Sequence, residues 1–588
     1  MIAIDFETFY SRTHTIGVWG PWGYAQHPDT DVYMVSVVGE GIEFVGHPSA
    51  FDWSRLNGKH LVSHNAGFDM TVAHAAVDRG LIPAFDYASW SCSADLMANQ
   101  GYPRSLADAT KASFDVELPK VMRQWMSGRS WDYAVQKGRD KQLLEYALND
   151  SRWCLNLWDK HSSDWPETER QLSAHTRGLI WRGVTLDVTA LERGQAKLRS
   201  LRDESEDLIP WKNEGPVLSL PILKDYCLTL GVPAPTSLAK DSDECQAWED
   251  KWGGHFAWIE ALRNYRRSNI LLNKVEAMLR RVRPDGTMPV YLKYWGAHPG
   301  RWSGDAGVNL QNLPRGEMFG VNLRHTLIPR AGHKFVICDL SQIEPRVLFW
   351  LAGDREMLDA IKSGVPLYEA HARNTMGWTG GKLKDADPAQ YQLAKARVLG
   401  LGYGCGWRKF VSVAKALADL DLPADESERI VSDWRRDNQS IVRFWKKLGG
   451  KLEAASDRGM VEMEFDLPSG RAMRWWHPRP DPEGGPYGPS YMVQQAKGKH
   501  WLHTWGGKMT ENVVQGLSRD IFAHHLMEVE RAGIPVTFSV HDELVCEVPE
   551  DQATDALEEM RRIMSTPPPW IKDLPLAAEG SIEDRYTK

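Results

Sequence analysis

The stretch that most constrains the fold lies at residues 536–548, where two apolar runs flank His541, Asp542 and Glu543. Apolar runs of this kind are typical of buried strands, and charged side chains are seldom buried unless they are paired or bind a metal ion. Asp readily adopts turn conformations. The stretch therefore predicts a hairpin with His541 and Asp542 at its turn, so that the carboxylates lie at an exposed tip.

A second strand is predicted at residues 334–340, and it ends at Asp339 with Glu344 soon after. If the two strand tips lie side by side, the carboxylates of Asp339 and Asp542 repel each other unless cations are present. Carboxylate oxygens are the ligands that Mg²⁺ and Mn²⁺ prefer. The pattern predicts a site for two divalent ions, an arrangement that catalyses phosphoryl transfer.

Between these strands, residues 391–404 place Tyr391, Lys395, Leu399 and Tyr403 four residues apart. That spacing puts the four side chains on one face of a helix. A lysine among apolar and aromatic side chains could bind a triphosphate and cover a base. Taken alone, the stretch is better explained as an amphipathic core helix whose lysine reaches solvent.

A further set of carboxylates lies in the first 150 residues. Asp5 and Glu7 are two apart on a predicted strand and share a face, and Tyr146 and Asp150 are four apart on a predicted helix. With Asp69 the segment offers carboxylates from three elements, plus a phenol. Each piece alone is ordinary for a strand edge or a surface helix. Together, their order and spacing predict another two-metal site that uses Mg²⁺ or Mn²⁺.

The length of the chain limits the number of domains, and its net charge limits the kinds of partner. A chain of 588 residues has room for about three to five domains. Its net charge of -8 gives no sign of nucleic-acid binding, so a DNA cleft must carry its basic groups locally. The candidates for that cleft are Arg263, Arg266, Arg267, Lys274, Arg280 and Arg281. Binding through such groups weakens steeply with added salt.

The seven cysteines are dispersed and include no CxxC pair, which favours free thiols in a reducing cytosol over a zinc site. The sequence reaches Asp5 almost at once, so no signal peptide is expected. No apolar run is long enough to span a bilayer. A cytoplasmic protein without a membrane partner is therefore predicted.

Three segments of the N-terminal part resemble the motifs of proofreading 3′–5′ exonucleases, in the same order. They read IDFET at 4–8, HNAGFD at 64–69 and YALND at 146–150. The resemblance implies that Tyr146 orients an attacking water molecule. It also implies the metal ligands Asp5, Glu7, Asp69 and Asp150.

The rest of the chain resembles the family A DNA polymerases, the bacterial DNA polymerase I family. The segments that carry the resemblance read HPGRWSGDAGVNLQNLPRG, DLSQIEPR, the 391–404 helix, ENVVQG and VHDE. The resemblance covers nearly the whole chain. Because the exonuclease motif begins at residue 5, no N-terminal 5′ nuclease is expected, as in phage members of the family.

The resemblance implies a role for each residue of the second site. Asp339 and Asp542 hold two ions with help from the Leu340 carbonyl, and Glu543 supports them. Lys395 binds the incoming triphosphate and protonates the pyrophosphate, and Glu344 blocks a ribose 2′-OH. The other positions at the nucleotide are Tyr391, Leu399 and Tyr403. The contacts to the primer–template are Arg301, Gln515 and His541.

The sequence departs from the family pattern around the nucleotide. Tyr391 stands where an arginine is usual, Leu399 where an aromatic residue is usual, and Leu340 and Pro345 alter the DYSQIELR pattern. A lost arginine removes a charged hydrogen bond worth about 1.5–3 kcal/mol. The hypothesis that follows is an altered nucleotide selectivity, suited to a phage genome with a modified base.

The expected fold class is a multidomain α/β and α+β protein, with a ribonuclease H-like 3′–5′ exonuclease domain followed by a right-hand polymerase of palm, fingers and thumb. The expected partners are primer–template DNA and dNTPs, and the expected state is a monomer in the host cytoplasm. The predicted domains are exonuclease 1–160, thumb 161–290, palm 291–360 and 446–588, and fingers 361–445.

The sequence pattern also predicts individual elements. Residues 1–9 indicate an opening strand, with antiparallel neighbours at 32–39 and 42–46. Residues 165–290 and the 100 residues after the strand at 334–340 indicate mostly helix. A hairpin is expected around 465–476, and helices at 511–531 and 550–564.

Three other functions compete with this interpretation. A stand-alone 3′–5′ exonuclease would use the C-terminal part only to hold DNA, which leaves Asp339, Lys395 and Asp542 without a role. A single-subunit RNA polymerase would share the palm, but Glu344 and the proofreading motifs favour DNA. A non-catalytic replication scaffold would leave both carboxylate sets unexplained.

Overall fold

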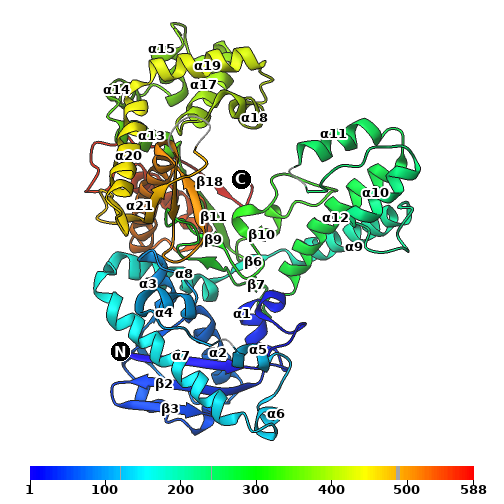
Figure 1. The fold of residues 1–588 in the computed structure, drawn as a ribbon, viewed down its shortest axis with the longest axis vertical. Helices are drawn as coiled ribbons and strands as arrows, with labels where there is room; N and C mark the ends of the chain where they lie inside the picture. The colour runs from blue at the N-terminus through cyan, green and yellow to red at the C-terminus, as the bar shows by residue number, and fades with distance from the viewer. Residues whose placement is uncertain (120, 240–241, 485–489) are drawn as a thin grey trace.

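Three parts of the chain lie along the long axis of the structure, a computed structural model (Figure 1). An N-terminal sheet with its helices forms one end, a group of helices forms the other, and a second sheet lies between them. A pair of long helices projects from the middle as an arm. The structure describes residues 1–588 except 120, 240–241 and 485–489.

The N-terminal sheet has five strands in the order β3-β2-β1-β4-β5. β1 (Ile2–Thr8) is central; it pairs antiparallel with β2 (Val32–Gly39) and parallel with β4 (Lys59–Ser63). β3 (Ile42–Gly46) and β5 (Tyr87–Cys92) form the edges. The predicted opening strand and its antiparallel neighbour are confirmed, and β3 lies one strand farther out, paired with β2.

The alternation of side chains along β1 sets up the first site. Ile4 and Phe6 are buried in the sheet's core, whereas Asp5 and Glu7 lie on the other face and remain partly exposed. α7 (Asp140–His161) packs against β1 and β2. The helices around this sheet are α1 (Ile16–Gln26), α2 (Ala66–Asp78), α3 (Ser93–Asn99), α4 (Leu106–Phe114), α5 (Val121–Met126) and α6 (Trp131–Gln136).

The arm in Figure 1 is built on the helices α9 (Val188–Asp207) and α12 (Ala257–Leu279), which pack along each other. α10 (Leu220–Thr229) and α11 (Asp243–Trp252) complete its tip. This confirms the predicted helical segment, and the structure adds a short sheet of β10, β6 and β7 at the base of the arm. The remaining bounds are α8 (Glu167–Arg182), β6 (Val184–Leu186), β7 (Thr287–Met288), β8 (Leu292–Lys293), β9 (Ser303–Gly304) and β10 (Leu327–Ile328).

The central sheet has the order β16-β17-β11-β18, and its paired strands are antiparallel. In β11 (His333–Leu340), Phe335 and Ile337 join the core under the arm, while Val336 and Cys338 join the core that contains α21 and α22. Burial on both faces explains why the strand is an unbroken apolar run. The partner strands are β16 (Val536–Val540), β17 (Glu543–Pro549) and β18 (Ala578–Glu583).

The far end of the molecule is helical, as predicted for the 100 residues after β11. α17 (Pro388–Leu401) begins where Asp387 accepts a hydrogen bond from the Gln390 amide over 2.9 Å. It ends before Tyr403, which lies in the following turn. The other helices are α13 (Ile343–Ala352), α14 (Arg355–Lys362), α15 (Leu367–Thr375), α16 (Leu383–Ala386), α18 (Trp407–Ala418), α19 (Ala424–Asp437) and α20 (Gln439–Asp457).

A third sheet of order β12-β13-β14-β15 follows, and its first pair is the hairpin predicted around 465–476. α21 is longer than the predicted 511–531, and α22 begins three residues later than predicted. The bounds are β12 (Glu462–Asp466), β13 (Ala472–Pro480), β14 (Tyr491–Gln494), β15 (Trp501–Thr504), α21 (Gly506–Arg531) and α22 (Ala553–Ser565).

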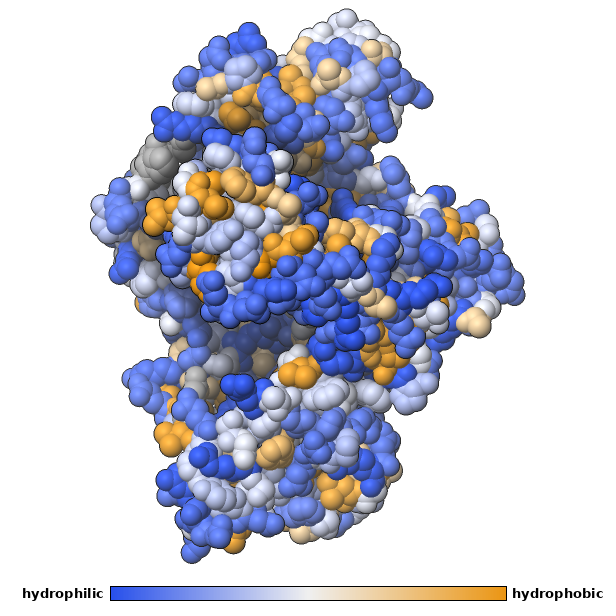
Figure 2. Space-filling model, turned by 90° about the vertical axis from the view of Figure 1, so that its right-hand side faces the viewer, coloured by the Kyte–Doolittle hydropathy of each residue, from blue (hydrophilic) through white to orange (hydrophobic). Residues whose placement is uncertain are grey.

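The surface on the arm side is mostly hydrophilic, and its apolar patches are separated from one another (Figure 2). Within the part of the chain that the structure describes, no helix combines the length and the apolarity needed to cross a membrane. The mixed α/β architecture agrees with the predicted fold class. The ribonuclease H-like assignment and the four domain boundaries stay predictions.

Candidate active sites

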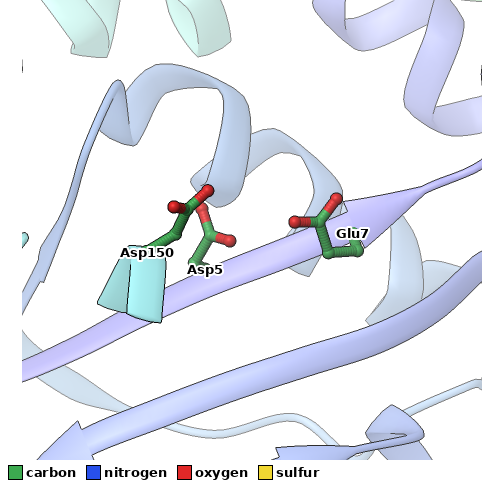
Figure 3. A group of neighbouring side chains, drawn as sticks. All are labelled: Asp5, Glu7 and Asp150. Carbon is green, nitrogen blue, oxygen red and sulfur yellow. The ribbon is translucent and has the colours of Figure 1, made fainter. Parts of the chain in front are cut away.

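The first carboxylate site joins β1 to α7. Asp5 and Glu7 extend from β1 toward Asp150 on α7 (Figure 3), and one carboxylate oxygen from each lies within 4.8 Å of the other two. Asp150 follows Glu7 by 143 positions in the sequence, and packing of α7 on the strand brings the three residues together. The three oxygens are close enough to ligate one ion.

Asp69 does not belong to this group of three. It lies in the first turn of α2, is 1% exposed, and accepts a hydrogen bond from the Phe6 amide over 3.1 Å. Its charge still reaches the site, because it contributes to the raised pKa of Asp5. The structure thus brings three of the four predicted ligands together and holds the fourth, on α2, by a hydrogen bond from the backbone of β1.

The electrostatics of the first site favour a bound cation. Burial and the neighbouring carboxylates raise the pKa of Glu7 to about 8, and burial raises that of Asp150 to about 6. The Arg123 guanidinium opposes both shifts. Mutual repulsion of this kind is relieved by a divalent ion, and carboxylate oxygens suit Mg²⁺ or Mn²⁺. The donor set therefore fits the metal predicted from the sequence.

Tyr146 lies one helical turn before Asp150 on α7. Burial, together with the charges of Glu7 and Asp150, raises the pKa of its phenol. The hydroxyl therefore stays protonated at neutral pH and remains a hydrogen-bond donor beside the carboxylates. This is the position that the sequence pattern predicted for it.

The second site forms where two strands of the central sheet end. Asp339, near the end of β11, is the cross-strand partner of Glu543, the first residue of β17. The Leu340 amide donates a hydrogen bond to the Asp542 carbonyl over 3.1 Å. His541 has a φ of 56° and, with Asp542, forms the two-residue turn between β16 and β17. The predicted hairpin and the predicted pairing of the two tips are both present.

Burial raises the pKa of Asp542, and the negative charge of Asp339 raises it further. The two carboxylates therefore repel each other. Glu543 is 6% exposed, and its Oε1 has no hydrogen-bond partner in the described part of the chain. A buried acceptor without a donor is costly unless a ligand satisfies it. The second site therefore also fits a divalent cation held by oxygen ligands.

Sequence reasoning missed one member of this site, Lys588. Its Nζ lies 2.9 Å from Asp339 Oδ1 and 3.3 Å from Glu543 Oε2. No motif surrounds Lys588 in the sequence. Its position follows from β18, which pairs with β11 and directs the segment after it back to the carboxylates.

Glu344 lies in the first turn of α13 and faces the same space. Arg301 Nη1 donates to it over 3.1 Å, and the Tyr403 hydroxyl donates over 3.5 Å. Burial raises the pKa of Glu344, and the Asp542 charge contributes to that shift. The structure thus brings Glu344 into contact with Tyr403 and Arg301, three residues to which the resemblance gives separate roles at the nucleotide and the primer–template.

The predicted stripe on α17 is the partly exposed face of that helix. Tyr391, Lys395 and Leu399 are partly exposed, whereas Ala394 and Val398 are buried against the core. Tyr403 lies just past the helix end, where α21 begins at Gly506–Gly507. A Cβ at Gly507 would collide with the Tyr403 carbonyl oxygen. Glycine therefore allows α21 to touch the end of α17.

The other predicted DNA contacts lie on three elements. Arg301 is in the loop before β9, and Gln515 on α21 donates to Glu511 over 3.5 Å. His541 is exposed at the hairpin turn. Partial burial and the charges of Arg301, Arg315 and Arg324 lower the pKa of His541. Three positive charges therefore act on His541.

For two of the six basic residues named as candidates for the DNA cleft, the prediction is wrong. Arg266 is 5% exposed and pairs with Glu249 at 2.7 Å. Arg281 is 2% exposed and donates to the carbonyls of Gly17 and Ala306. Both guanidinium groups hold protein segments together, so neither presents its charge to DNA. The four others, Arg263, Arg267, Lys274 and Arg280, are more exposed, and their role stays a prediction.

Known proteins resemble the chain in both sequence and structure. The model of the DNA polymerase family A matches residues 248–468. A DNA polymerase of Bacillus phage SP02 is 27% identical over 594 aligned positions, which cover 90% of this chain and 89% of the phage protein. The thermostable DNA polymerase I of Thermus filiformis is 27% identical over 462 positions, covering 75% of this chain and 51% of that protein. The chain thus spans about half the length of this bacterial relative.

Among solved structures, the fold resembles the POL domain of Pol1 from M. smegmatis, determined in complex with DNA primer-template and dNTP. The TM-score is 0.67 at 18% sequence identity, and the match covers 100% of this chain and 95% of that one. The likeness at this identity concerns the fold. The chain is thus similar to the family A DNA polymerases in its sequence motifs, in residues 248–468 and in its phage and bacterial relatives.

Proposed function

We propose that the chain is a DNA-directed DNA polymerase that extends a primer 3′-OH with dNTPs and removes misincorporated nucleotides with a 3′–5′ exonuclease. The observation that carries the proposal is the pair of separate carboxylate sites. One is built on β1 and α7, and the other on β11 and the β16–β17 turn. The match of residues 248–468 to the DNA polymerase family A model and the likeness to a phage DNA polymerase support the polymerase assignment for the second site.

In the polymerase site, Asp339, Asp542 and the Leu340 carbonyl would hold two divalent ions. Bound ions would activate the primer hydroxyl and neutralise the charge on the leaving pyrophosphate. Lys395, on the open face of α17, binds the triphosphate as a point charge and supplies a proton to the leaving group. Glu543 positions Asp339 through their cross-strand pairing.

Recognition of the sugar falls to Glu344. Because Arg301 and Tyr403 hold its carboxylate, the side chain forms a fixed wall beside Asp542. A 2′-OH that meets this wall would have to displace one of these hydrogen bonds. His541 lies at the hairpin tip, and the charge of Arg301 acts on it from the loop before β9. Both residues would contact the primer end, which must lie near the carboxylates for in-line attack. Gln515 on α21 would contact the duplex behind that end.

In the exonuclease site, Asp5, Glu7 and Asp150 would hold the ions, with Asp69 as a further carboxylate. Bound ions would generate a nucleophilic water and stabilise the leaving 3′ oxygen. The protonated Tyr146 hydroxyl donates a hydrogen bond that orients this water. The hydrolysis releases a deoxynucleoside monophosphate and restores a primer 3′-OH.

The nucleotide pocket departs from the family pattern at two neighbouring positions. Tyr391 packs edge-on against Tyr368 with ring centroids 5.7 Å apart. A tyrosine here supplies no positive charge, unlike the arginine that is usual in the family. Leu399 offers no flat surface for stacking. We therefore propose an altered nucleotide selectivity, suited to a phage genome with a modified base. Single-nucleotide insertion kinetics with natural and modified dNTPs test it, and equal efficiencies would contradict it.

We propose a role in phage DNA replication, which the likeness to a phage DNA polymerase supports. Mg²⁺ or Mn²⁺ as cofactor and a monomer in the host cytoplasm are further parts of the proposal. A stand-alone exonuclease would leave the Asp339, Asp542 and Glu344 cluster without a purpose. We therefore do not favour that alternative. Any accessory protein that raises processivity would be a further partner.

Primer extension with two variants tests the two activities separately. Asp542→Asn should abolish extension and leave 3′–5′ degradation of single-stranded DNA intact. The double variant Asp5→Ala with Glu7→Ala should do the reverse. Extension that survives Asp542→Asn would refute the polymerase site. Degradation that survives the double variant would refute the exonuclease site.

A further inference from the structure

The segment after β18 returns to the polymerase carboxylates and places a cation among them. Lys588 Nζ lies 2.9 Å from Asp339 Oδ1 and 3.3 Å from Glu543 Oε2. Both carboxylates come from adjacent strands of the central sheet. A primary ammonium at these distances is a charged hydrogen-bond donor to both groups. Lys588 therefore bridges the two strand ends.

The segment that carries Lys588 is anchored in the core. Tyr586 is 1% exposed, lies edge-on to Phe538 at 5.3 Å, and donates its amide to the Leu327 carbonyl over 3.0 Å. The Arg324 guanidinium lies 5.3 Å from the centre of the Tyr586 ring and donates to the Lys588 carbonyl. The buried contacts of Tyr586 therefore fix the backbone two residues before the ammonium. Only the side chain of Lys588 must move for the ammonium to leave the carboxylates.

The ammonium and a divalent ion would compete for the same oxygen. A metal ion that takes Asp339 Oδ1 as a ligand would lie close to the ammonium that donates to that atom at 2.9 Å. Two cations this near each other repel, so the binding of one disfavours the other. The side chain of Lys588 is 36% exposed, so a path to solvent is open to it.

We infer that Lys588 is an internal occupant of the polymerase metal site. In the absence of metal, its ammonium satisfies Asp339 and Glu543 and keeps the two strand ends together. Divalent ions bind after the ammonium leaves. The apparent metal affinity is therefore the intrinsic affinity multiplied by the fraction of molecules in which Lys588 has left the site. Incoming nucleotide favours the exchange because its phosphates supply further ligands to the ion. The inference rests on the proposed polymerase function of this site.

Mn²⁺ binding to the full chain, measured by electron paramagnetic resonance of the free ion without DNA or nucleotide, tests the inference. The parent protein carries Asp5→Ala and Glu7→Ala, so that the exonuclease carboxylates do not contribute. Lys588→Met keeps the length of the side chain and removes its charge. We expect it to bind Mn²⁺ about threefold or more tightly than the parent.

Matched variants separate this effect from general charge. Lys572→Met removes an exposed lysine elsewhere in the same C-terminal region and should bind like the parent. Lys588→Arg keeps a cation and should also stay near the parent value. A Lys588→Met protein that binds Mn²⁺ no more tightly than the parent would refute the inference.

Two further measurements complete the test. Asp339→Asn in the parent should abolish this Mn²⁺ binding; if the parent shows no binding that depends on Asp339, the proposed metal site itself is wrong. Reductive methylation of lysine side chains in the parent, read by mass spectrometry, should modify the Lys588 amine faster when Mn²⁺ is added, because the side chain leaves the carboxylates while the backbone stays anchored. An unchanged methylation rate at saturating Mn²⁺ would contradict release of the lysine, even if the Lys588→Met protein were unstable.

Discussion

Arg301 donates a hydrogen bond to Glu344 over 3.1 Å, and this contact links the loop before β9 to the first turn of α13. The pair is 43 residues apart in sequence and lies beside the Asp542 carboxylate. A carboxylate fixed from one side by a guanidinium and from the other by a phenol is a rigid polar wall. Its rigidity is what makes it suitable for rejecting one extra hydroxyl on a sugar.

Glu344→Ala should weaken the discrimination against ribonucleotides. The smaller side chain opens the space that a 2′-OH would occupy, so ribonucleotide insertion relative to deoxyribonucleotide insertion should rise roughly tenfold or more. Single-turnover insertion of paired rNTP and dNTP substrates measures the ratio. Glu511→Ala removes a nearby carboxylate that does not bind Arg301 and serves as the control. An unchanged ratio in Glu344→Ala would remove this residue from sugar selection.

Tyr146→Phe should slow the exonuclease without touching extension. The ring and its packing remain, but the hydroxyl beside Asp150 is lost, so the water loses one orienting hydrogen bond. A supporting contact of this kind is worth roughly ten- to a hundredfold in rate. Degradation of a labelled single strand at saturating Mg²⁺ gives the rate, and primer extension by the same preparation reports on folding. A variant that degrades DNA at the unsubstituted rate would contradict the role.

The predictable parts of both sites are those fixed by local periodicity. Strand alternation placed Asp5 beside Glu7, helical spacing placed Tyr146 beside Asp150, and the hairpin pattern placed Asp542 at a turn. In each case, the backbone period alone determines which side chains share a face. Their meeting across elements followed from the resemblance to known motifs.

Positions set by distant packing could not be read from the sequence. Lys588 reaches Asp339 only because β18 pairs with β11. Arg266 and Arg281 resembled free cations in the sequence, but Arg266 pairs with Glu249, and Arg281 donates to the carbonyls of Gly17 in α1 and of Ala306. Asp69 had the motif of a ligand, yet the Phe6 amide holds one of its oxygens. Each case depends on a partner that no local pattern names.

The buried ion pair between Glu169 on α8 and Arg519 on α21 should be important for stability. Arg519 Nη2 donates to Glu169 Oε2 over 2.8 Å, and the side chains are 1% and 8% exposed. Glu169→Ala leaves a buried guanidinium without its main partner and should cost about 3–5 kcal/mol. Urea denaturation followed by tryptophan fluorescence measures the loss.

The double variant Glu169→Ala with Arg519→Met is the control for that pair. Because it removes both charges, it should recover part of the stability that the single variant loses. Equal stability of the single and double variants would mean that the unpaired charge is not the cause. Both proteins should be compared at the same ionic strength.

Glu530 near the end of α21 should make the packing of α8 on the central sheet sensitive to acid. Burial alone would raise its pKa, but hydrogen bonds from His175 and Arg182 lower it to about 2. The Val536 amide also donates to Glu530 over 2.9 Å. A depressed carboxyl pKa contributes stability above the unfolded-state value of about 4.3 and loses it as the pH falls toward 2.

Glu530→Gln should therefore lower stability at neutral pH by about 1.5–3 kcal/mol, the range for hydrogen bonds to a charged group. It should also flatten the fall in stability between pH 5 and pH 2, because the amide does not titrate. Urea midpoints of both proteins across that range give the two slopes. Glu528→Gln, which lies two residues earlier and pairs only with Arg531 near the surface, should leave the slope unchanged. A steep slope that persists in Glu530→Gln would assign the acid sensitivity to other carboxylates.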